Sequence, residues 1–229
     1  MKISAQTREV KMKFTPGTVF SIKRDYPPTA GCTTSEAIQH SDTLSVSVFS
    51  LAAHTDISAE TYTYPKLLLV AGGEAESYES GGRTWVLAEG DALITPVDVP
   101  VGIRSREGCV YTELIPAKET YVNEKIRAGE IVRLAELLPT QDGKIVNMDL
   151  THNDGMKLAL MSFAAGTGLD EHAAPGDALV FALEGEAIVG YEGAEHRIHA
   201  GENFKFDKGG RHYVRADQPF KMALLLVRE

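Results

Sequence analysis

The stretch "EHAAPGDALVFALEGEA" (Glu171–Ala187) leads from a histidine through an apolar segment to a glycine turn. Its centre, "ALVFA" at 178–182, has the length and the branched and aromatic content of a buried strand. Other apolar segments in the chain also stop at glycine-rich turns, such as "ESGGR", "AEGD", "YEGAE" and "HAGEN". Tight turns at short spacing leave little room for crossover helices. The sequence therefore predicts an all-β fold of antiparallel barrels or jelly rolls.

An internal repeat divides the chain into two halves. A shift of 112 residues aligns "FSLAAHT" (Phe49–Thr55) with "MSFAAGT" (Met161–Thr167), and it places the "GEA" at 73–75 on the "GEA" at 185–187. After one extra residue in the "ESGGR" turn, the shift becomes 111. Sequence similarity between segments this far apart indicates a duplicated structural unit. We predict two domains, an N-terminal barrel over residues 1–125 and a C-terminal barrel over residues 126–229.

The segment between the two halves differs in character from both. It is charged, and "EIVRLAELL" (Glu130–Leu138) has apolar residues at helical spacing just before Pro139. This pattern predicts a short helical linker between the barrels.

Composition excludes several classes of partner. The 32 acidic and 23 basic residues give a formal net charge of -9, which is unfavourable for binding a phosphate backbone or an anionic membrane. The start of the chain lacks an apolar run typical of a signal peptide, and no stretch approaches the length of a membrane span. We therefore expect a cytoplasmic protein without a nucleic-acid or membrane partner. The two widely spaced cysteines, Cys32 and Cys109, indicate reduced thiols rather than a disulfide framework.

The glycine and histidine pattern of the second half resembles the cupin family. The first cupin motif places His-x-His and Glu between two glycines, and the second places a histidine after Pro-x-Gly and ahead of an asparagine. The corresponding residues here are Gly166, His172, Ala174, Ala178 and Gly185 for the first motif, and Gly201, Asp207, Gly209, His212 and Ala216 for the second. Of the four positions that supply metal ligands in the family, only the first and last histidines are kept.

The resemblance implies two tandem cupin barrels, each a double-stranded β-helix of the jelly-roll type, with a pocket at His172 and His212. Because side chains alternate along a strand, residues 172 and 174 share a face, but Ala174 offers no ligand. Stable divalent sites usually take three or more side-chain ligands. Asp177 and Asp170 are the nearest candidates to complete a site for Fe, Mn, Ni or Zn. The alternatives are that the two histidines contact a ligand without metal, or that they are purely structural.

The first half departs further from the family pattern. Its matching positions are Glu60, Tyr62, Lys66 and Val101, so the resemblance implies no family-type metal site there. Glu60 and Lys66 share strand parity, and we expect an ion pair between them across a cavity that the tyrosines fill. On this interpretation the N-terminal barrel is a scaffold. The alternative places all four residues at a solvent-facing barrel edge.

Three functions are compatible with this sequence. The incomplete ligand set favours a small-molecule binding protein that holds a sugar-like or carboxylate-like compound in the C-terminal barrel. The second is a metal-dependent isomerase or dioxygenase of the cupin type, and the third is a structural module, because fold alone does not choose between them. The segment at 13–29 is predicted to cover an exposed strand edge within the chain or in a partner, which makes a homodimer plausible.

Overall fold

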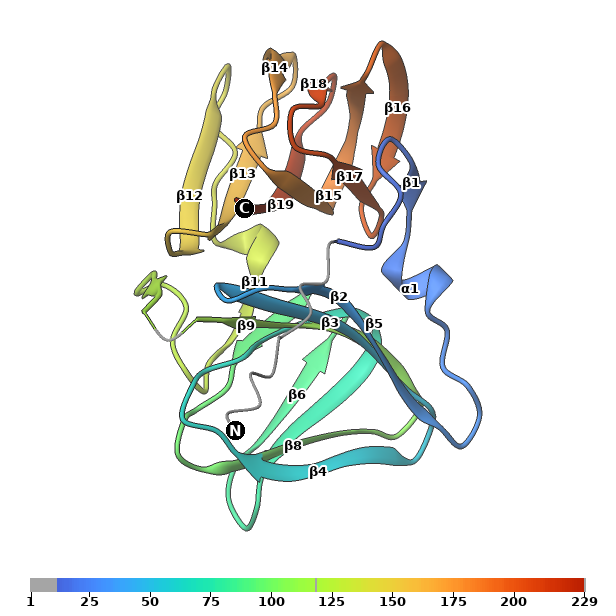
Figure 1. Ribbon diagram of the computed structural model, residues 1–229, viewed down its shortest axis with the longest axis vertical. Helices are drawn as coiled ribbons and strands as arrows, with labels where there is room; N and C mark the ends of the chain where they lie inside the picture. The colour runs from blue at the N-terminus through green and yellow to red at the C-terminus, as the bar shows by residue number, and fades with distance from the viewer. Residues whose placement is uncertain (1–11, 118, 229) are drawn as a thin grey trace, which may run out of the picture.

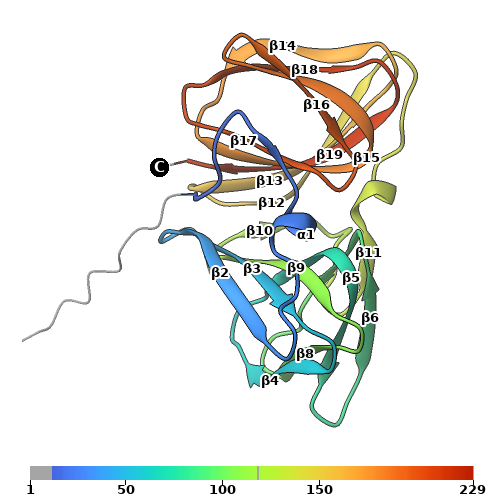
Figure 2. The same cartoon turned by 90° about the vertical axis from the view of Figure 1, so that its right-hand side faces the viewer.

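The computed structural model describes residues 12–117 and 119–228, and strands make up nearly all of its regular structure (Figure 1). Two barrels lie one above the other, with the N-terminal half of the chain below and the C-terminal half above (Figures 1 and 2). Only two short helices occur among the described residues, α1 (Ile22–Asp25) and the 3-10 turn η1 (Leu134–Glu136). The predicted all-β fold of two jelly-roll barrels is confirmed.

Nine strands of the described residues form the N-terminal barrel. These are β2 (Thr33–His40), β3 (Leu44–Leu51), β4 (Thr55–Thr61), β5 (Leu67–Glu79), β6 (Thr84–Ala88), β7 (Asp91–Ile94), β8 (Pro100–Ser105), β9 (Cys109–Pro116) and β11 (Ile131–Arg133). They follow the order β11-β7-β5-β9-β3-β2, while β4, β6 and β8 close the opposite side.

Within residues 12–117 and 119–228, ten strands form the C-terminal barrel. These are β1 (Val19–Phe20), β10 (Tyr121–Val122), β12 (Ile145–His152), β13 (Met156–Phe163), β14 (Thr167–Ala173), β15 (Asp177–Tyr191), β16 (Ala194–His199), β17 (Asn203–Phe206), β18 (Arg211–Ala216) and β19 (Phe220–Val227). They follow the order β1-β17-β15-β19-β13-β12-β10, with β14, β16 and β18 on the opposite side.

Repeated glycines explain part of the sequence repeat. Gly73 and Gly185 have φ angles of 75° and 76°, in the left-handed region. An added Cβ at either position would lie 2.2 Å from a backbone oxygen, that of Gly108 or that of Pro219. Only glycine fits where the long strands β5 and β15 bend from one side of their barrel to the other.

Three short strands, β1, β10 and β11, each pair with the barrel of the other half of the chain. β1 pairs with β17 of the C-terminal barrel, so the segment at 13–29 covers a strand edge within the chain, as one of the two predicted alternatives has it. β10 pairs with β12, whereas β11, which comes later in the chain, pairs with β7 of the N-terminal barrel. The linker therefore contributes to both barrels, and a boundary at residue 125 stays a prediction.

The predicted linker helix is replaced by shorter structure. Residues 131–133 form the edge strand β11 against β7, and only Leu134–Glu136 turn as a 3-10 helix. An open sheet edge offers backbone hydrogen bonds that compete with helical ones, and an isolated helix as short as the nine residues 130–138 is only marginally stable. The helical pattern is therefore correct for one turn only.

Three hydrophobic clusters organise the packing. One lines the N-terminal barrel, one fills the C-terminal barrel, and the third lies between them. Along β5, Leu68 and Val70 point into the barrel, while Leu67 and Leu69 belong to the cluster between the barrels. The long sheets are thus apolar on both faces, which explains their continuous apolar runs in the sequence. This shared core fixes the two barrels together.

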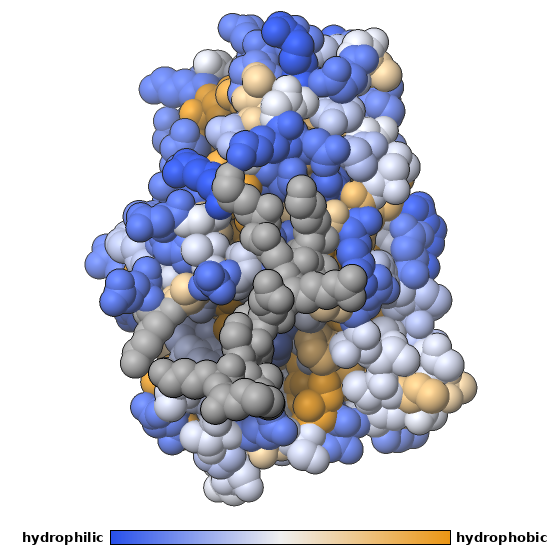
Figure 3. All heavy atoms as spheres, in the orientation of Figure 1, coloured by the Kyte–Doolittle hydropathy of each residue, from blue (hydrophilic) through white to orange (hydrophobic). Residues whose placement is uncertain are grey.

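The surface is mostly polar on the face seen in Figure 3, where apolar residues form separate small patches. Exposed large apolar side chains include Val86, Tyr121 and Ile131. Within the part of the chain that the structure describes, no helix has the length and apolar character needed to cross a membrane.

Candidate functional site

The two barrels place equivalent residue pairs at the same point of their folds. His172 on β14 lies opposite His212 on β18, and at the matching position of the first half Glu60 on β4 lies opposite Val101 on β8. A register irregularity precedes both pairs. The sequence alignment of the two halves therefore corresponds to a structural equivalence, and the two sites can be compared residue by residue.

The structure brings His172 and His212 together. Their ring centroids lie 4.2 Å apart, with an interplanar angle of 52°. Each ring places Nδ1 near a main-chain carbonyl, 2.8 Å from Asp170 O for His172 and 3.1 Å from Gly210 O for His212. A carbonyl only accepts, so Nδ1 carries the proton in both neutral rings and Nε2 keeps its lone pair.

The two histidines differ in exposure. His172 is exposed, whereas His212 is buried and stacks on Phe206, with ring centroids 4.0 Å apart. Burial lowers the pKa of His212, and the neighbouring His172 lowers it further. His212 is therefore held neutral through most of the physiological pH range.

The two predicted carboxylates do not complete this pair. Asp170 is exposed, and the contact recorded for it with His172 is made by its carbonyl. Asp177 accepts a hydrogen bond from the backbone of Lys208 at 3.0 Å, and its other oxygen lies 3.4 Å from Lys205 Nζ. Among the described residues, no group of three or more His, Cys, Asp or Glu side chains is placed to hold a metal ion. Two imidazoles do not make a stable divalent site, so the residues present do not fit the metal of the family pattern.

Aromatic side chains fill the C-terminal barrel behind the histidines. Phe163, Phe204, Phe206 and Phe220 are each no more than 1% exposed, and Ala174, at the position of the second family histidine, is also buried. The interior predicted to hold a ligand is thus packed as a hydrophobic core.

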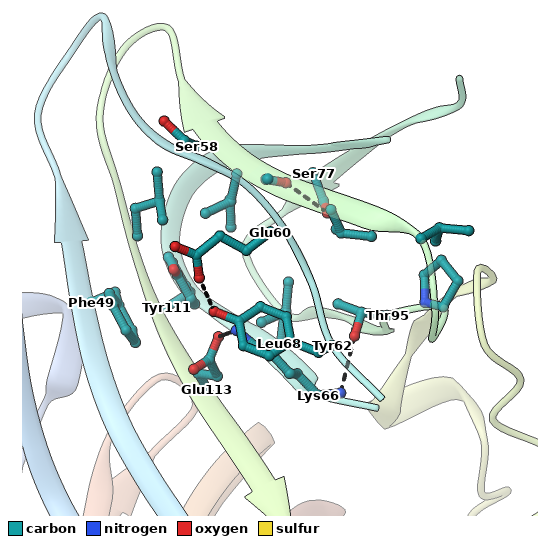
Figure 4. Close-up of a pocket in the computed structure, with 16 residues that line it drawn as sticks. Phe49, Ser58, Glu60, Tyr62, Lys66, Leu68, Ser77, Thr95, Tyr111 and Glu113 are labelled. Carbon is teal, nitrogen blue, oxygen red and sulfur yellow. Dashed lines mark hydrogen bonds and ion pairs between the residues drawn. The ribbon is translucent and has the colours of Figure 1, made fainter. Parts of the chain in front are cut away.

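The N-terminal barrel contains a cavity of about 190 Å³ at the equivalent place (Figure 4). The sequence-derived interpretation of this barrel as a filled scaffold is not met, because Glu60, Tyr62 and Lys66 line open space. Phe49 and Tyr111 form part of the wall as a stacked pair with centroids 5.1 Å apart. The cavity therefore combines aromatic faces with charged groups.

Lys66 does not pair with Glu60, as the sequence had suggested, but with Glu113 on β9. Lys66 Nζ lies 3.3 Å from a Glu113 carboxylate oxygen, and the two side chains are only 15% and 12% exposed. The same ammonium lies 3.6 Å above the ring of Tyr62. Burial raises the pKa of Glu113, although Lys66 opposes this effect. Glu60 and Lys66 both line the cavity, as their shared strand parity predicts, but the carboxylate of Glu113 on β9 lies closer to Lys66.

Glu60 instead accepts a hydrogen bond from the Tyr62 hydroxyl, as the dashed line in Figure 4 marks. This bond to Glu60 raises the pKa of Tyr62 well above its usual value, and burial adds to the shift. Tyr62 is thus a protonated donor at physiological pH, and its carboxylate partner keeps further acceptor capacity.

Sequence reasoning missed Glu113, although the repeat carried a signal for it. Cys109, Tyr111 and Glu113 alternate along β9 toward the barrel interior. A shift of 111 places them on Phe220, Met222 and Leu224, which are all part of the apolar filling of the C-terminal barrel or packed against it. A glutamate at a position that is apolar in the other half indicates a polar interior.

Titration of Tyr62 tests this hydrogen bond. We expect Glu60→Gln to lower the pKa of Tyr62, because a neutral amide no longer favours the protonated phenol over the charged phenolate. The shift can be followed by NMR of tyrosine labelled at Cζ, in the parent and in the variant. An unchanged Tyr62 titration in Glu60→Gln would show that Glu60 is not its partner in solution.

Comparison with known proteins finds a family match for part of the chain and solved structures with a similar fold. A model of the Cupin domain family matches residues 159–228. The "Cupin 2 conserved barrel domain protein" from Leptotrichia buccalis superposes with a TM-score of 0.82 at 26% identity, over 95% of this chain and 99% of that chain. Residues 159–228 therefore form a Cupin domain, and the chain as a whole has the cupin fold. No curated protein sequence matches the chain.

A second cupin similarity concerns an enzyme. A salicylate 1,2-dioxygenase variant from Pseudoaminobacter salicylatoxidans, in complex with gentisate, superposes with a TM-score of 0.63 over 92% of this chain and 81% of that chain. Its sequence identity is 11%, so the likeness shows the fold alone. The chemistry of this cupin has to be argued from its own residues.

Proposed function

We propose that this cupin binds a compact, neutral, hydroxyl-bearing small molecule of the sugar-like class in the cavity of the N-terminal barrel. The observation that carries the proposal is the cavity itself, in which Glu60, Tyr62 and the Lys66–Glu113 pair face about 190 Å³ of space. Cavities that hold ligands typically combine apolar walls with a few placed polar groups. This site has both.

The charges of the cavity favour a neutral ligand over a carboxylate. The ammonium of Lys66 is already compensated by Glu113, and Glu60 adds a further carboxylate. An anionic ligand would place its charge near these carboxylates, which is unfavourable, most of all beside Glu113, whose side chain is only 12% exposed. Hydroxyl groups of a sugar can instead donate to Glu60, while the C–H face of the ring packs on an aromatic wall such as Tyr62.

The proposal places the ligand in the N-terminal rather than the C-terminal barrel. Buried phenylalanines occupy the interior behind His172 and His212, whereas the equivalent region of the first half is open and polar. The alternative of a metal-dependent isomerase or dioxygenase lacks support from the residues, because no group of three potential ligands is assembled within the described ranges.

A paired ligand screen tests the proposal. Glucose and glucuronate differ by one carboxylate, and similar pairs exist for smaller sugars and polyols. We expect neutral members of the panel to shift the methyl resonances of Leu68, Ile57 and Ile103, which line the cavity, and their acids to bind more weakly. Binding of the acids alone would contradict the proposal.

Two variants locate the site. Glu60→Gln removes a charged acceptor and should weaken binding by about tenfold or more, because hydrogen bonds to charged groups contribute roughly 1.5–3 kcal/mol. His172→Ala, at the equivalent position of the other barrel, should leave the affinity unchanged. The opposite result, a loss in His172→Ala and none in Glu60→Gln, would place the ligand in the C-terminal barrel.

A further inference from the structure

A second and larger cavity lies between the two barrels. It has a volume of about 550 Å³ and is lined from both halves by residues 69–71 of β5 and residues 181–183 of β15. The two segments are equivalent under the shift of 112 that relates the halves. In Figure 2, α1 lies in front of the junction between the barrels, and η1, drawn in yellow-green, lies beside it. Both also contribute to the lining, through Ile22 and Glu136. We call this space the inter-barrel cleft.

Both strands carry a bulge at the cleft. The β5–β9 pairing steps from Val70 to Gly72, so Ala71 is an extra residue, and the β15–β19 pairing steps from Ala182 to Glu184 around Leu183. A bulge bends its strand and increases the local twist. Because the bulges occur at equivalent positions, both sheets bend where they face one another. Bulges commonly lie beside functional sites, and these two place Ala71 and Leu183 on the cleft wall.

The walls are mainly apolar, but one buried hydroxyl lacks a partner. Leu69 and Phe181, which are equivalent under the shift of 112, both belong to the lining and to the hydrophobic cluster between the barrels. Thr112 on β9 also lines the cleft, is 1% exposed, and its Oγ1 has no hydrogen-bond partner among the described residues. A buried hydroxyl without a partner costs free energy. This hydroxyl is available to hydrogen-bond a molecule bound in the cleft.

The rim of the cleft has an excess of negative charge. Glu89 pairs with Lys23 at 2.6 Å, and Glu184 pairs with Lys221 at 3.0 Å. Arg133, the basic residue of the lining, is compensated by Asp91 at 3.0 Å.

Two rim carboxylates are left without a cationic partner of this kind. Glu202 accepts a hydrogen bond from the backbone N–H of His199 at 2.8 Å, and no lysine or arginine forms an ion pair with it within the described residues. Glu136, which is exposed on η1, makes no hydrogen bond or ion pair within the described part of the chain. The rim is thus complementary to a cation.

We propose that the inter-barrel cleft is a second ligand site, which binds an organic ammonium ion with an apolar or aromatic body. The body packs between Leu69 and Phe181 and against the bulged Leu183, and the ammonium lies at the rim near Glu136 and Glu202. A volume of about 550 Å³ falls within the range of sites that enclose a complete small metabolite. Clefts at domain interfaces are a common place for such sites.

A matched set of three probes tests charge and location together. Phenethylammonium, 2-phenylethanol and 3-phenylpropanoate share an aromatic body and differ in the charge of the end group. We expect phenethylammonium to shift the methyl resonances of Ile22, Leu69 and Leu183, 2-phenylethanol to do so at higher concentration, and 3-phenylpropanoate to have no effect. Resonance shifts with 3-phenylpropanoate equal to those with phenethylammonium would overturn the proposal. So would the absence of any shift with phenethylammonium up to its solubility limit.

Variants of residues in and outside the lining test whether phenethylammonium binds in the inter-barrel cleft. Glu136→Gln should weaken phenethylammonium binding by about two- to fivefold, as expected for one exposed charge, while Glu107→Gln, an exposed glutamate outside the lining, should not. Ala71→Trp should abolish binding by filling the cleft, and the charge variants keep the test decisive if this variant does not fold. Glu60→Gln should leave the ammonium affinity unchanged, which separates this site from the sugar-like site. A loss in Glu107→Gln equal to that in Glu136→Gln would contradict the rim assignment.

Discussion

Replacing Lys66 by methionine is expected to lower the free energy of unfolding by about 3–5 kcal/mol at neutral pH. Lys66 and Glu113 are both largely buried, and methionine fills a similar volume without the charge. The variant leaves the Glu113 carboxylate in the cavity without its counter-charge. Removing one partner of a buried pair is costly because the remaining charge is uncompensated. Chemical denaturation of the parent and the variant measures the loss.

The loss should depend on pH with a defined sign. Burial raises the pKa of Glu113 in the folded parent, and Lys66 limits the rise. Without Lys66 the folded pKa rises further, so the folded variant takes up a proton at a pH where the unfolded chain does not. The destabilisation is therefore fully present above the raised folded pKa and decreases as the pH falls toward the unfolded value of about 4.3.

A double variant separates lost charge pairing from lost packing. Lys66→Met/Glu113→Gln removes both charges, and we expect it to recover most of the stability, since a neutral pair of similar volume carries no uncompensated charge. If the double variant is as unstable as Lys66→Met at all pH values, the effect arises from packing, and the electrostatic description of the cavity fails.

The fold was largely predictable from the sequence because strand periods and turn glycines are local signals. The equivalent glycines at 73 and 185 lie at the same backbone bend in each half. A bend that has no room for a Cβ requires glycine in the sequence. The linker was harder to predict. Residues 131–133 have helical spacing, but they form a strand because the edge of β7 lies beside them, and no local pattern carries that information.

The candidate site was predictable only in part for a similar reason. The resemblance to the cupin motifs implied a pocket at His172 and His212, and the structure brings the two rings together across neighbouring strands. The partner of Lys66 was mistaken, because Glu113 comes from β9, nearly 50 residues later in the chain, and strand parity does not tell which strands are neighbours. Whether an interior is open or filled depends on the summed volume of side chains from several strands, which a motif does not record.

Replacing Phe206 by alanine is expected to cost about 3–5 kcal/mol of unfolding free energy. Phe206 is 1% exposed, lies in the filled interior of the C-terminal barrel, and packs on the ring of His212. Its loss removes apolar contacts and opens a cavity that the surrounding strands fill only partly. Phe206→Leu keeps most of the volume and should cost clearly less.

The same substitution should change the titration of His212. Burial lowers the pKa of this histidine in the parent, so the unfolded state binds the proton more readily than the folded state. Its contribution to stability is complete above the unfolded value of about 6.5 and is lost as the pH falls below it. In Phe206→Ala, water reaches the ring, the pKa of His212 rises toward its ordinary value, and this part of the pH dependence shrinks.

These two readouts together decide between the barrels as ligand sites. A large loss of stability with a raised His212 pKa means that Phe206 is part of a packed core, and the histidine pair then lies at the mouth of a barrel with no interior space for a ligand. A loss below about 1 kcal/mol, with Phe206→Leu equally mild, means that the interior is loosely packed. In that case His172 and His212 would border accessible volume, and a ligand in the C-terminal barrel would have to be considered again.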